Sequence, residues 1–267
     1  IWGMGIASRD LTGDGRPEVF LASQGDDKLQ TLAADADGPA YEDIALARGA
    51  TATRPAFGGD VLPSTSWHTE FGDANNDGRP DLLIAKGNVE AQPDYAAKDP
   101  SELLVGRADG TFARPGRATG IVSFDRARGG SLADLDLDGL PDVVLVGRRE
   151  PVRIWRGIGT GTVDAPVSPG CWLGLRLRQD GPDRDAIGAW IEVEAGEVRQ
   201  SIELTVGGGH GGGTLGWVHV GLGDAASANV RVTWPDGTTG PWQTLGADAR
   251  WVVARDAAAT AWEPPAP

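Results

Sequence analysis

One nine-residue acidic motif occurs three times at almost equal spacing, and it constrains the fold more than any other feature of the sequence. The copies cover residues 10–18, 73–81 and 134–142, so their starts lie 63 and 61 residues apart. Each copy has Asp-Gly at its fifth and sixth positions and Pro at its eighth. Self-similarity at a fixed period predicts a chain built by repeating one supersecondary unit.

Short apolar runs follow each copy, at residues 19–22, 82–85 and 143–146. Runs of this length bounded by Gly and Pro predict buried β-strands. Further strands are expected before the motif, at residues 65–71 and 130–133. No sustained helical periodicity occurs in this half of the chain.

Two Asp-Gly pairs shortly before an aromatic residue, at 37–41 and 109–112, predict hairpin turns. Each repeat therefore contains about four strands, which is the content of one blade of a β-propeller. The sequence predicts an all-β fold in which residues 1–165 form a partial β-propeller.

The motif places oxygen-bearing side chains at positions 1, 3, 5 and 9, with Gly at position 6. Several carboxylates at alternate positions suit a hard cation, calcium in particular, and Gly allows the backbone to curl around it. The carbonyl of position 7 adds one more oxygen. Up to three Ca²⁺ are therefore expected, on the ligand sets Asp10, Thr12, Asp14, Arg16, Glu18; Asp73, Asn75, Asp77, Arg79, Asp81; and Asp134, Asp136, Asp138, Leu140, Asp142.

The motif has two other interpretations. An EF-hand requires Glu at position 12, and here that position is Leu21, Ile84 or Leu145 inside an apolar run, so the EF-hand is excluded. Ordinary Asx-rich turns without metal are the remaining alternative, and three copies in register count against it. The first loop is the weakest candidate, because Thr12 and Glu18 depart from the Asp/Asn pattern.

The charge balance of the chain restricts the binding partners and the cellular location that are expected for it. The formal net charge is −14, which disfavours nucleic acid as a partner, and three Ca²⁺ (six positive charges) would bring it to −8. Sites of this kind are filled at extracellular rather than cytosolic calcium, so an extracytoplasmic location is expected. No apolar run is long enough to span a bilayer, and no signal peptide is evident; since the chain opens at Ile1, its true N-terminus is expected to lie further upstream.

A different pattern begins after about residue 165, where the acidic motif stops. Alternating strands are expected at 172–178, 187–194, 198–206, 215–220, 229–234 and 250–255. Residues 166–256 therefore predict a small β-sandwich or barrel-like domain, and residues 257–267 a flexible tail.

A Gly-rich run at residues 207–213 surrounds His210, and the strand after it carries Trp217 and His219. A dinucleotide-binding loop would need a helix next, so the run is interpreted as a mobile loop at a binding rim. His210, Trp217 and His219 are the candidate ligand-binding residues. The ordinary alternative is that the two histidines are a loop residue and a satisfied sheet residue.

These residues resemble a known family. The acidic loops resemble FG-GAP (VCBS) repeats, and residues 185–189, the Gly-rich run, 219–223 and 234–237 resemble the ASPIC/UnbV domain, in the order of the cartilage-acidic-protein-like family. The resemblance implies a β-propeller, Ca²⁺ at the matched positions, and secretion. Propellers of this family usually have more blades than the three marked here, which leaves three alternatives: further blades in sequence before Ile1, a partner chain that completes the propeller, or no further blades at all. Val220 stands where the family commonly has Phe.

No nucleophile elbow, zinc-helix motif or Walker loop occurs, and Cys171 is the single cysteine. The predicted function is a non-enzymatic, calcium-binding extracytoplasmic module with a structural role or a role in binding protein or glycan, alone or as a subunit of a larger assembly. The alternative is an enzyme or biosynthetic accessory protein of the UnbV type, acting near the Gly-rich loop with Ca²⁺ as a Lewis acid.

Overall fold

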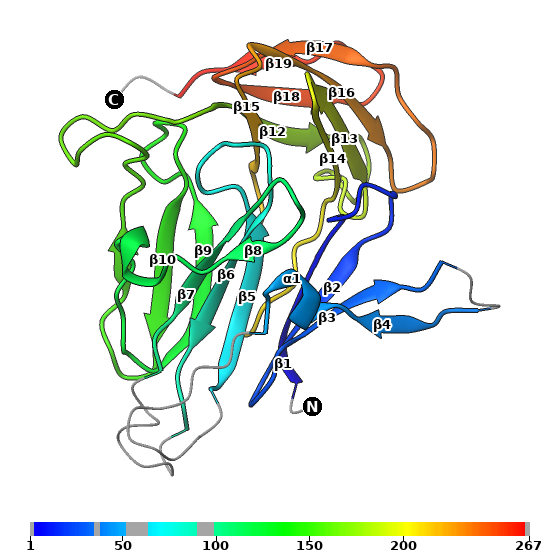
Figure 1. Cartoon of the computed structure of the whole chain (residues 1–267). Coiled ribbons are helices and arrows are strands. Elements are labelled where there is room, and N and C mark those ends of the chain that lie inside the picture. Colours follow the sequence, from blue (N-terminus) through cyan, green and yellow to red (C-terminus); the bar gives the residue numbers. More distant parts are fainter. Residues whose placement is uncertain (1–2, 35–37, 52–63, 90–98, 265–267) are drawn as a thin grey trace.

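The computed structural model describes residues 3–34, 38–51, 64–89 and 99–264, and the strands there form five sheets (Figure 1). Helical structure in this part of the chain is confined to α1 (Ala45–Arg48) and the 3-10 turn η1 (Gly116–Thr119). The all-β prediction is therefore confirmed.

The first three sheets are propeller blades, each made of antiparallel neighbours in sequence order. Blade 1 comprises β1 (Gly3–Arg9), β2 (Glu18–Ser23), β3 (Lys28–Leu32) and β4 (Tyr41–Asp43). Blade 2 comprises β5 (Ser66–Gly72), β6 (Asp81–Lys86), β7 (Glu102–Gly106) and β8 (Phe112–Ala113). Blade 3 comprises β9 (Ala127–Ala133), β10 (Asp142–Gly147) and β11 (Arg153–Trp155). The acidic motif connects the first two strands of every blade, as the repeat predicts.

The structure describes one of the two predicted hairpin turns completely and the other in part. At residues 109–112 the turn joins β7 to β8, with the Arg107 N–H donating to the Thr111 carbonyl at 2.9 Å. The turn predicted at 37–41 connects β3 to β4, but residue 37 lies outside the described residues.

Blades pack face to face through alternate residues of their strands. Successive side chains point to opposite faces of a strand, so β6, whose six residues are all buried, contributes to two cores. Leu82 and Ile84 pack with Phe20 of blade 1, while Leu83 and Ala85 pack with blade 3. The apolar run after the motif is therefore what joins each blade to the next.

The last two sheets form a β-sandwich, which confirms the predicted second fold. One sheet has the order β15–β12–β18–β19 and the other β14–β13–β16–β17, with a shared apolar core between them. The strands are β12 (Cys171–Arg178), β13 (Trp190–Ala195), β14 (Val198–Glu203), β15 (Val218–Gly223), β16 (Ser227–Thr233), β17 (Gln243–Gly246), β18 (Ala249–Ala254) and β19 (Thr260–Trp262).

The prediction of a flexible tail from residue 257 is wrong for its first part. β19 pairs antiparallel with β18, with Trp262 opposite Arg250 and Thr260 opposite Val252. The exposed edge of β18 offers backbone hydrogen bonds that the sequence pattern alone does not reveal.

The sandwich lies over the end of the blades that carries the acidic loops (Figure 1). The Gly223 N–H donates to the Asn76 carbonyl at 2.9 Å, and Arg250 of β18 forms an ion pair with Asp134. The acidic loops of blades 2 and 3 are therefore part of the interface between the two halves of the chain.

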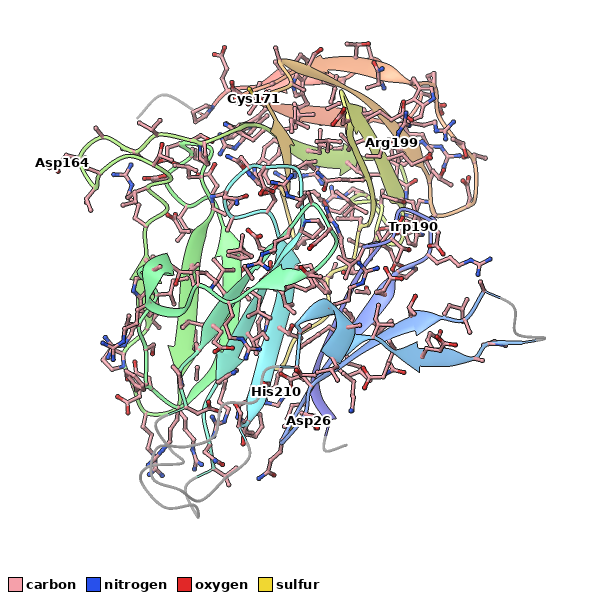
Figure 2. The ribbon with its side chains drawn as sticks, viewed as in Figure 1. Asp26, Asp164, Cys171, Trp190, Arg199 and His210 are labelled. Carbon is pink, nitrogen blue, oxygen red and sulfur yellow. The ribbon has the colours of Figure 1, made fainter. Side chains whose placement is uncertain are left out.

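The connection between β14 and β15, residues 204–217, leaves the sandwich and runs along the inner strands of the blades (Figure 1). The Gly209 N–H donates to the Ile6 carbonyl at 2.7 Å, and the His210 N–H donates to His68 Nδ1 at 3.3 Å. Figure 2 places His210 far from Trp190 and Arg199 of the sandwich. The Gly-rich run is therefore held against the blades, whereas the sequence predicts a mobile loop at a rim.

Candidate metal and ligand sites

The first carboxylate of each acidic motif braces its own loop. Both oxygens of Asp10 accept backbone N–H groups, from Gly13 at 2.8 Å and Gly15 at 2.9 Å. The Gly78 N–H donates to Asp73 at 2.7 Å and the Gly139 N–H to Asp134 at 2.9 Å. The glycine at position 6 has φ between 80° and 89° in all three copies, which explains why the motif requires it.

The ninth residue of the motif ties the loop to its blade. Asp81 accepts the Ala74 N–H at 2.9 Å and the Gly106 N–H at 2.8 Å. Asp142 accepts two N–H groups in the same way, at 3.0 and 2.8 Å, and Glu18 accepts the Leu11 N–H at 2.8 Å. These oxygens already have protein partners, so a metal-ligating role for position 9 stays a prediction.

The third loop has the geometry of a cation site. Asp134, Asp136 and Asp138 place one carboxylate oxygen each within 4.8 Å of the others. The Oδ1 atom of Asp134 is buried and has no hydrogen-bond partner in the described part of the chain. Burial raises the pKa of Asp134, although the nearby Arg250 opposes the rise. Oxygen ligands from alternate residues with one unsatisfied buried acceptor fit Ca²⁺.

Two arginines partly neutralise this loop. Arg156 lies 2.7 Å from Asp136 and 3.0 Å from Asp138 on the exposed side, and Arg250 pairs with Asp134 on the buried side. The Leu140 N–H donates to Asp138 at 3.0 Å, which ties the backbone at position 7 to the cluster.

The second loop concentrates buried carboxylates, and Arg79 and Arg9 compensate their charge only in part. Burial raises the pKa of Asp73 to about 7, and the carboxylate of Asp77 adds to the rise. Burial likewise raises the pKa of Asp81 to about 8. Asn75 Oδ1 accepts the Asp77 N–H at 3.1 Å, and Arg79 pairs with Asp77 at 2.7 Å. A bound cation would stabilise the ionised form of these carboxylates.

The first loop is the most exposed of the three. Asp14 accepts the Arg16 N–H at 2.8 Å, and Thr12 Oγ1 lies 3.4 Å from Glu18. Thr12 and Asp14 are both exposed, so this loop offers a cation the least buried oxygens. This agrees with its weaker match to the motif.

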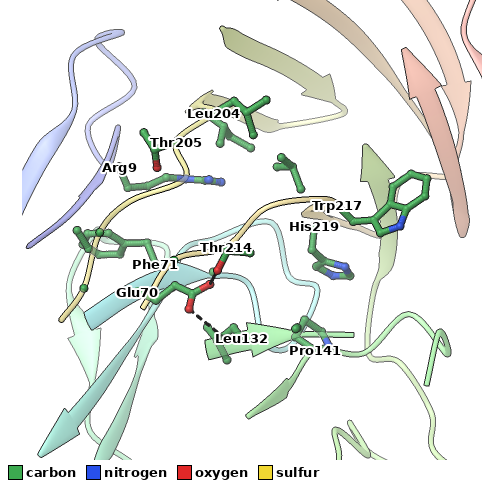
Figure 3. Close-up of a pocket in the computed structure, with 18 of the residues that line it drawn as sticks. Arg9, Glu70, Phe71, Leu132, Pro141, Leu204, Thr205, Thr214, Trp217 and His219 are labelled. Carbon is green, nitrogen blue, oxygen red and sulfur yellow. Dashed lines mark hydrogen bonds between the residues drawn. The ribbon is translucent and has the colours of Figure 1, made fainter. Parts of the chain in front are cut away.

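A cavity of about 680 Å³ lies between the inner strands of the blades, the sandwich and the β14–β15 connection (Figure 3). Of the three ligand-binding candidates, Trp217 and His219 line this cavity and His210 does not. His210 instead packs edge-on against Trp67, with ring centroids 4.9 Å apart.

His219 is satisfied by protein partners. Burial lowers its pKa to about 3, so the ring is neutral at physiological pH. The ring stacks on Trp172 with centroids 5.7 Å apart, and Nε2 lies 2.6 Å from Asn76 Oδ1. The ordinary interpretation as a satisfied sheet residue therefore describes His219.

Arg9, His68 and Glu70 are among the polar residues of the cavity wall that sequence reasoning missed. Arg9 directly precedes the first motif, and His68 and Glu70 alternate on β5 just before the second. The available signal was this alternation, because residues two apart on a strand share a face. Only the packing of blades around one axis brings Arg9 near the β5 residues.

Gly209 and Gly207 provide a matched test of how the β14–β15 connection is held. Gly209 has φ of 60°, and a Cβ there would collide with the His68 ring, whereas a Cβ on Gly207 would meet nothing within 4 Å. We expect Gly209→Ala to lower the free energy of unfolding by about 2 kcal/mol and Gly207→Ala to leave it nearly unchanged. Denaturant unfolding measures both, and equal effects would contradict this docking.

Together, the blades with their acidic turns and the appended sandwich define a β-propeller repeat protein. An FG-GAP-like repeat model matches residues 10–84 and 73–145, which together span half of the chain, and an ASPIC and UnbV model matches residues 179–260. The chain belongs to the FG-GAP repeat family and carries an ASPIC/UnbV domain. A search of curated proteins found no significant match. Among the described residues, no helix is long and apolar enough to cross a membrane.

Proposed function

We propose that this chain is a calcium-stabilised, non-catalytic binding module that works outside the cytoplasm. The observation that carries the proposal is the third acidic loop, where three carboxylates each place one oxygen within 4.8 Å of the others and Oδ1 of Asp134 has no hydrogen-bond partner among the described residues. Asp134, Asp136, Asp138 and the Leu140 carbonyl would hold Ca²⁺ there, and the corresponding positions of the other two loops would hold up to two more. Bound Ca²⁺ supplies positive charge that fixes each loop.

The same loops support the extracytoplasmic location. Each offers few ligands beyond exposed or already hydrogen-bonded oxygens, which is typical of sites that bind calcium with dissociation constants of roughly 0.1–1 mM. Such sites fill only at extracellular calcium concentrations. FG-GAP propellers are also usually non-catalytic and commonly extracellular.

The free face of blade 3 supports a protein partner that supplies a further blade. The second and fourth residues after the motif are buried against the next blade in blades 1 and 2, where they are Phe20, Ala22, Leu83 and Ala85. In blade 3 they are Val144, which is half-buried, and Val146, which is 44% exposed. Ile154 lies opposite Val144 on the same face and is 60% exposed. A propeller blade of a partner chain, presenting apolar residues as blade 2 does toward blade 1, would cover this surface.

A calorimetric titration with CaCl₂ tests the proposed function. We expect up to three ions to bind, with dissociation constants of about 0.1 mM. The double variant Asp136→Asn/Asp138→Asn should lose one ion, whereas Asp164→Asn, an exposed carboxylate outside the motifs, should bind as the parent chain does. Absence of calcium binding at millimolar concentration would refute the proposal.

A further inference from the structure

Asn76 of the second acidic loop is a buried polar residue that the expected calcium ligand set does not use. It occupies position 4 of the motif, between Asn75 and Asp77, and its side chain is fully buried. Its Nδ2 donates to the Gly139 carbonyl of the third loop and to Ser168 Oγ of the linker to the sandwich, each at 2.8 Å. The second and third acidic loops are therefore joined through this one side chain.

The sandwich packs on the same residue. His219 Nε2 lies 2.6 Å from Asn76 Oδ1, and since an amide oxygen only accepts, the imidazole is the donor. The Gly223 N–H donates to the Asn76 carbonyl at 2.9 Å. Between these two contacts, β15 runs so close to the second loop that a Cβ on Gly221 would overlap the Asp73 carboxylate. Asn76 therefore joins the second loop to β15 as well as to the third loop.

The third acidic loop contacts the sandwich through residues of its own. Arg250 forms the ion pair with Asp134 and also donates to the Leu137 carbonyl at 3.3 Å. Gly139 lies so close to the Trp172 ring that a Cβ there would overlap it. The second loop, the third loop and the sandwich thus form one continuous contact region, in which a shift of any one part displaces the other two.

The first acidic loop lacks this connection. Its position 4 is Gly13, whose φ of 76° is close to the 60° of Asn76. Gly13 is exposed, and a Cβ there would meet nothing within 4 Å. The motif therefore needs only a left-handed backbone at position 4, and the bonded side chain of Asn76 is a feature of the second loop.

We propose that Asn76 is a positioning residue that couples calcium binding in the second and third loops to the docking of the sandwich. An ion held by Asn75 and Asp77 fixes the backbone on both sides of Asn76, which in turn holds the Gly139 carbonyl and β15 in place. Each ion then favours the arrangement that the other needs, and this coupling is reciprocal. The first loop binds its ion independently. The inference rests on the proposed calcium binding and specifies how the sites are linked.

Calorimetric titrations with CaCl₂ test the coupling, because single loops can be disabled. When Asp10→Asn/Asp14→Asn disables the first loop, the two remaining ions should bind cooperatively, the second at least about fivefold more tightly than the first. When Asp136→Asn/Asp138→Asn disables the third loop instead, the two remaining ions should bind without cooperativity. Asn76→Gly, which gives the second loop the residue that the first loop has, should abolish the cooperativity in the first background.

Hydrogen–deuterium exchange measures the docking of the sandwich in the same proteins. In the parent chain, EGTA should speed exchange of the Gly223 amide at least about fivefold relative to CaCl₂, while the amide of Leu245, in the sandwich core, should not change. In Asn76→Gly, calcium should no longer protect Gly223. Gly13→Asn is the matched control, because it places the same side chain in the exposed first loop and should behave as the parent chain does.

His219→Phe provides a second variant that leaves the acidic loops unchanged. It keeps an aromatic ring beside Trp172 and removes the hydrogen bond to Asn76, so it should also reduce the calcium protection of Gly223. Independent binding of the two ions when the first loop is disabled, or protection of Gly223 that survives both variants, would overturn the inference and leave the proposed function standing. A parent chain that binds no calcium would overturn both.

Discussion

Removing calcium with EGTA is expected to lower the free energy of unfolding of this chain by about 4 kcal/mol. A site with a dissociation constant near 0.1 mM contributes about 1.4 kcal/mol when free calcium is about 1 mM, and the motif occurs three times. The loss is a large share of the stability of a typical domain. Denaturant unfolding in CaCl₂ and in EGTA measures it directly.

The structure identifies the unfavourable charges that a bound ion would offset. In the second loop, burial and the charge of Asp77 raise the pKa of Asp73 to about 7, so ionised Asp73 lies in an unfavourable environment without a cation. In the third loop, Asp134 keeps an unpartnered buried oxygen. The Asp136→Asn/Asp138→Asn variant should therefore respond to EGTA at least about one third less than the parent chain does. Identical unfolding curves with and without calcium would show that these loops are metal-free turns.

The repeat made the blades predictable, because the structure of each acidic loop is determined by residues within the motif itself. Asp at position 1 and Gly at position 6 close the loop within nine residues, and the apolar run that follows can only be buried as a strand between blades. The sandwich strands were predictable for the same reason, since alternation fixes the face of each strand. β17 and β19 were missed because each is short and is specified by the neighbouring strand that it pairs with.

The cavity was not predictable from local pattern. Its polar wall combines Arg9 and Glu70 with Thr214, which lies more than 140 positions after Glu70, and this juxtaposition exists only after the blades stack and the β14–β15 connection docks. The Gly run signalled flexibility in the sequence. In the structure, Gly209 is instead the position where the backbone passes closest to His68, and no side chain fits there.

The second large expected effect is a loss of folding stability when Arg250, at the interface between the sandwich and the blades, is replaced. Arg250 and Asp134 form an ion pair with side chains only 8% and 7% exposed, and Arg250 also lies 4.8 Å from the Trp172 ring centroid. Removing one partner of a buried pair leaves the other charge uncompensated, which typically costs about 3–5 kcal/mol. We therefore expect Arg250→Met to lower the free energy of unfolding by about 3 kcal/mol in EGTA.

Arg156 provides the matched control, because it pairs with Asp136 and Asp138 of the same loop while 40% exposed. Exposed pairs contribute about 1 kcal/mol or less, so Arg156→Met should have a small effect on the free energy of unfolding.

Calcium distinguishes an electrostatic cause of the Arg250→Met effect from a loss of packing. A bound ion beside Asp134 supplies the positive charge that Arg250→Met removes, so the cost of that variant should shrink in CaCl₂ while a packing defect would persist. Equal costs for the two arginine variants, or a cost of Arg250→Met that calcium leaves unchanged, would contradict the coupling of the sandwich to the third acidic loop through this ion pair.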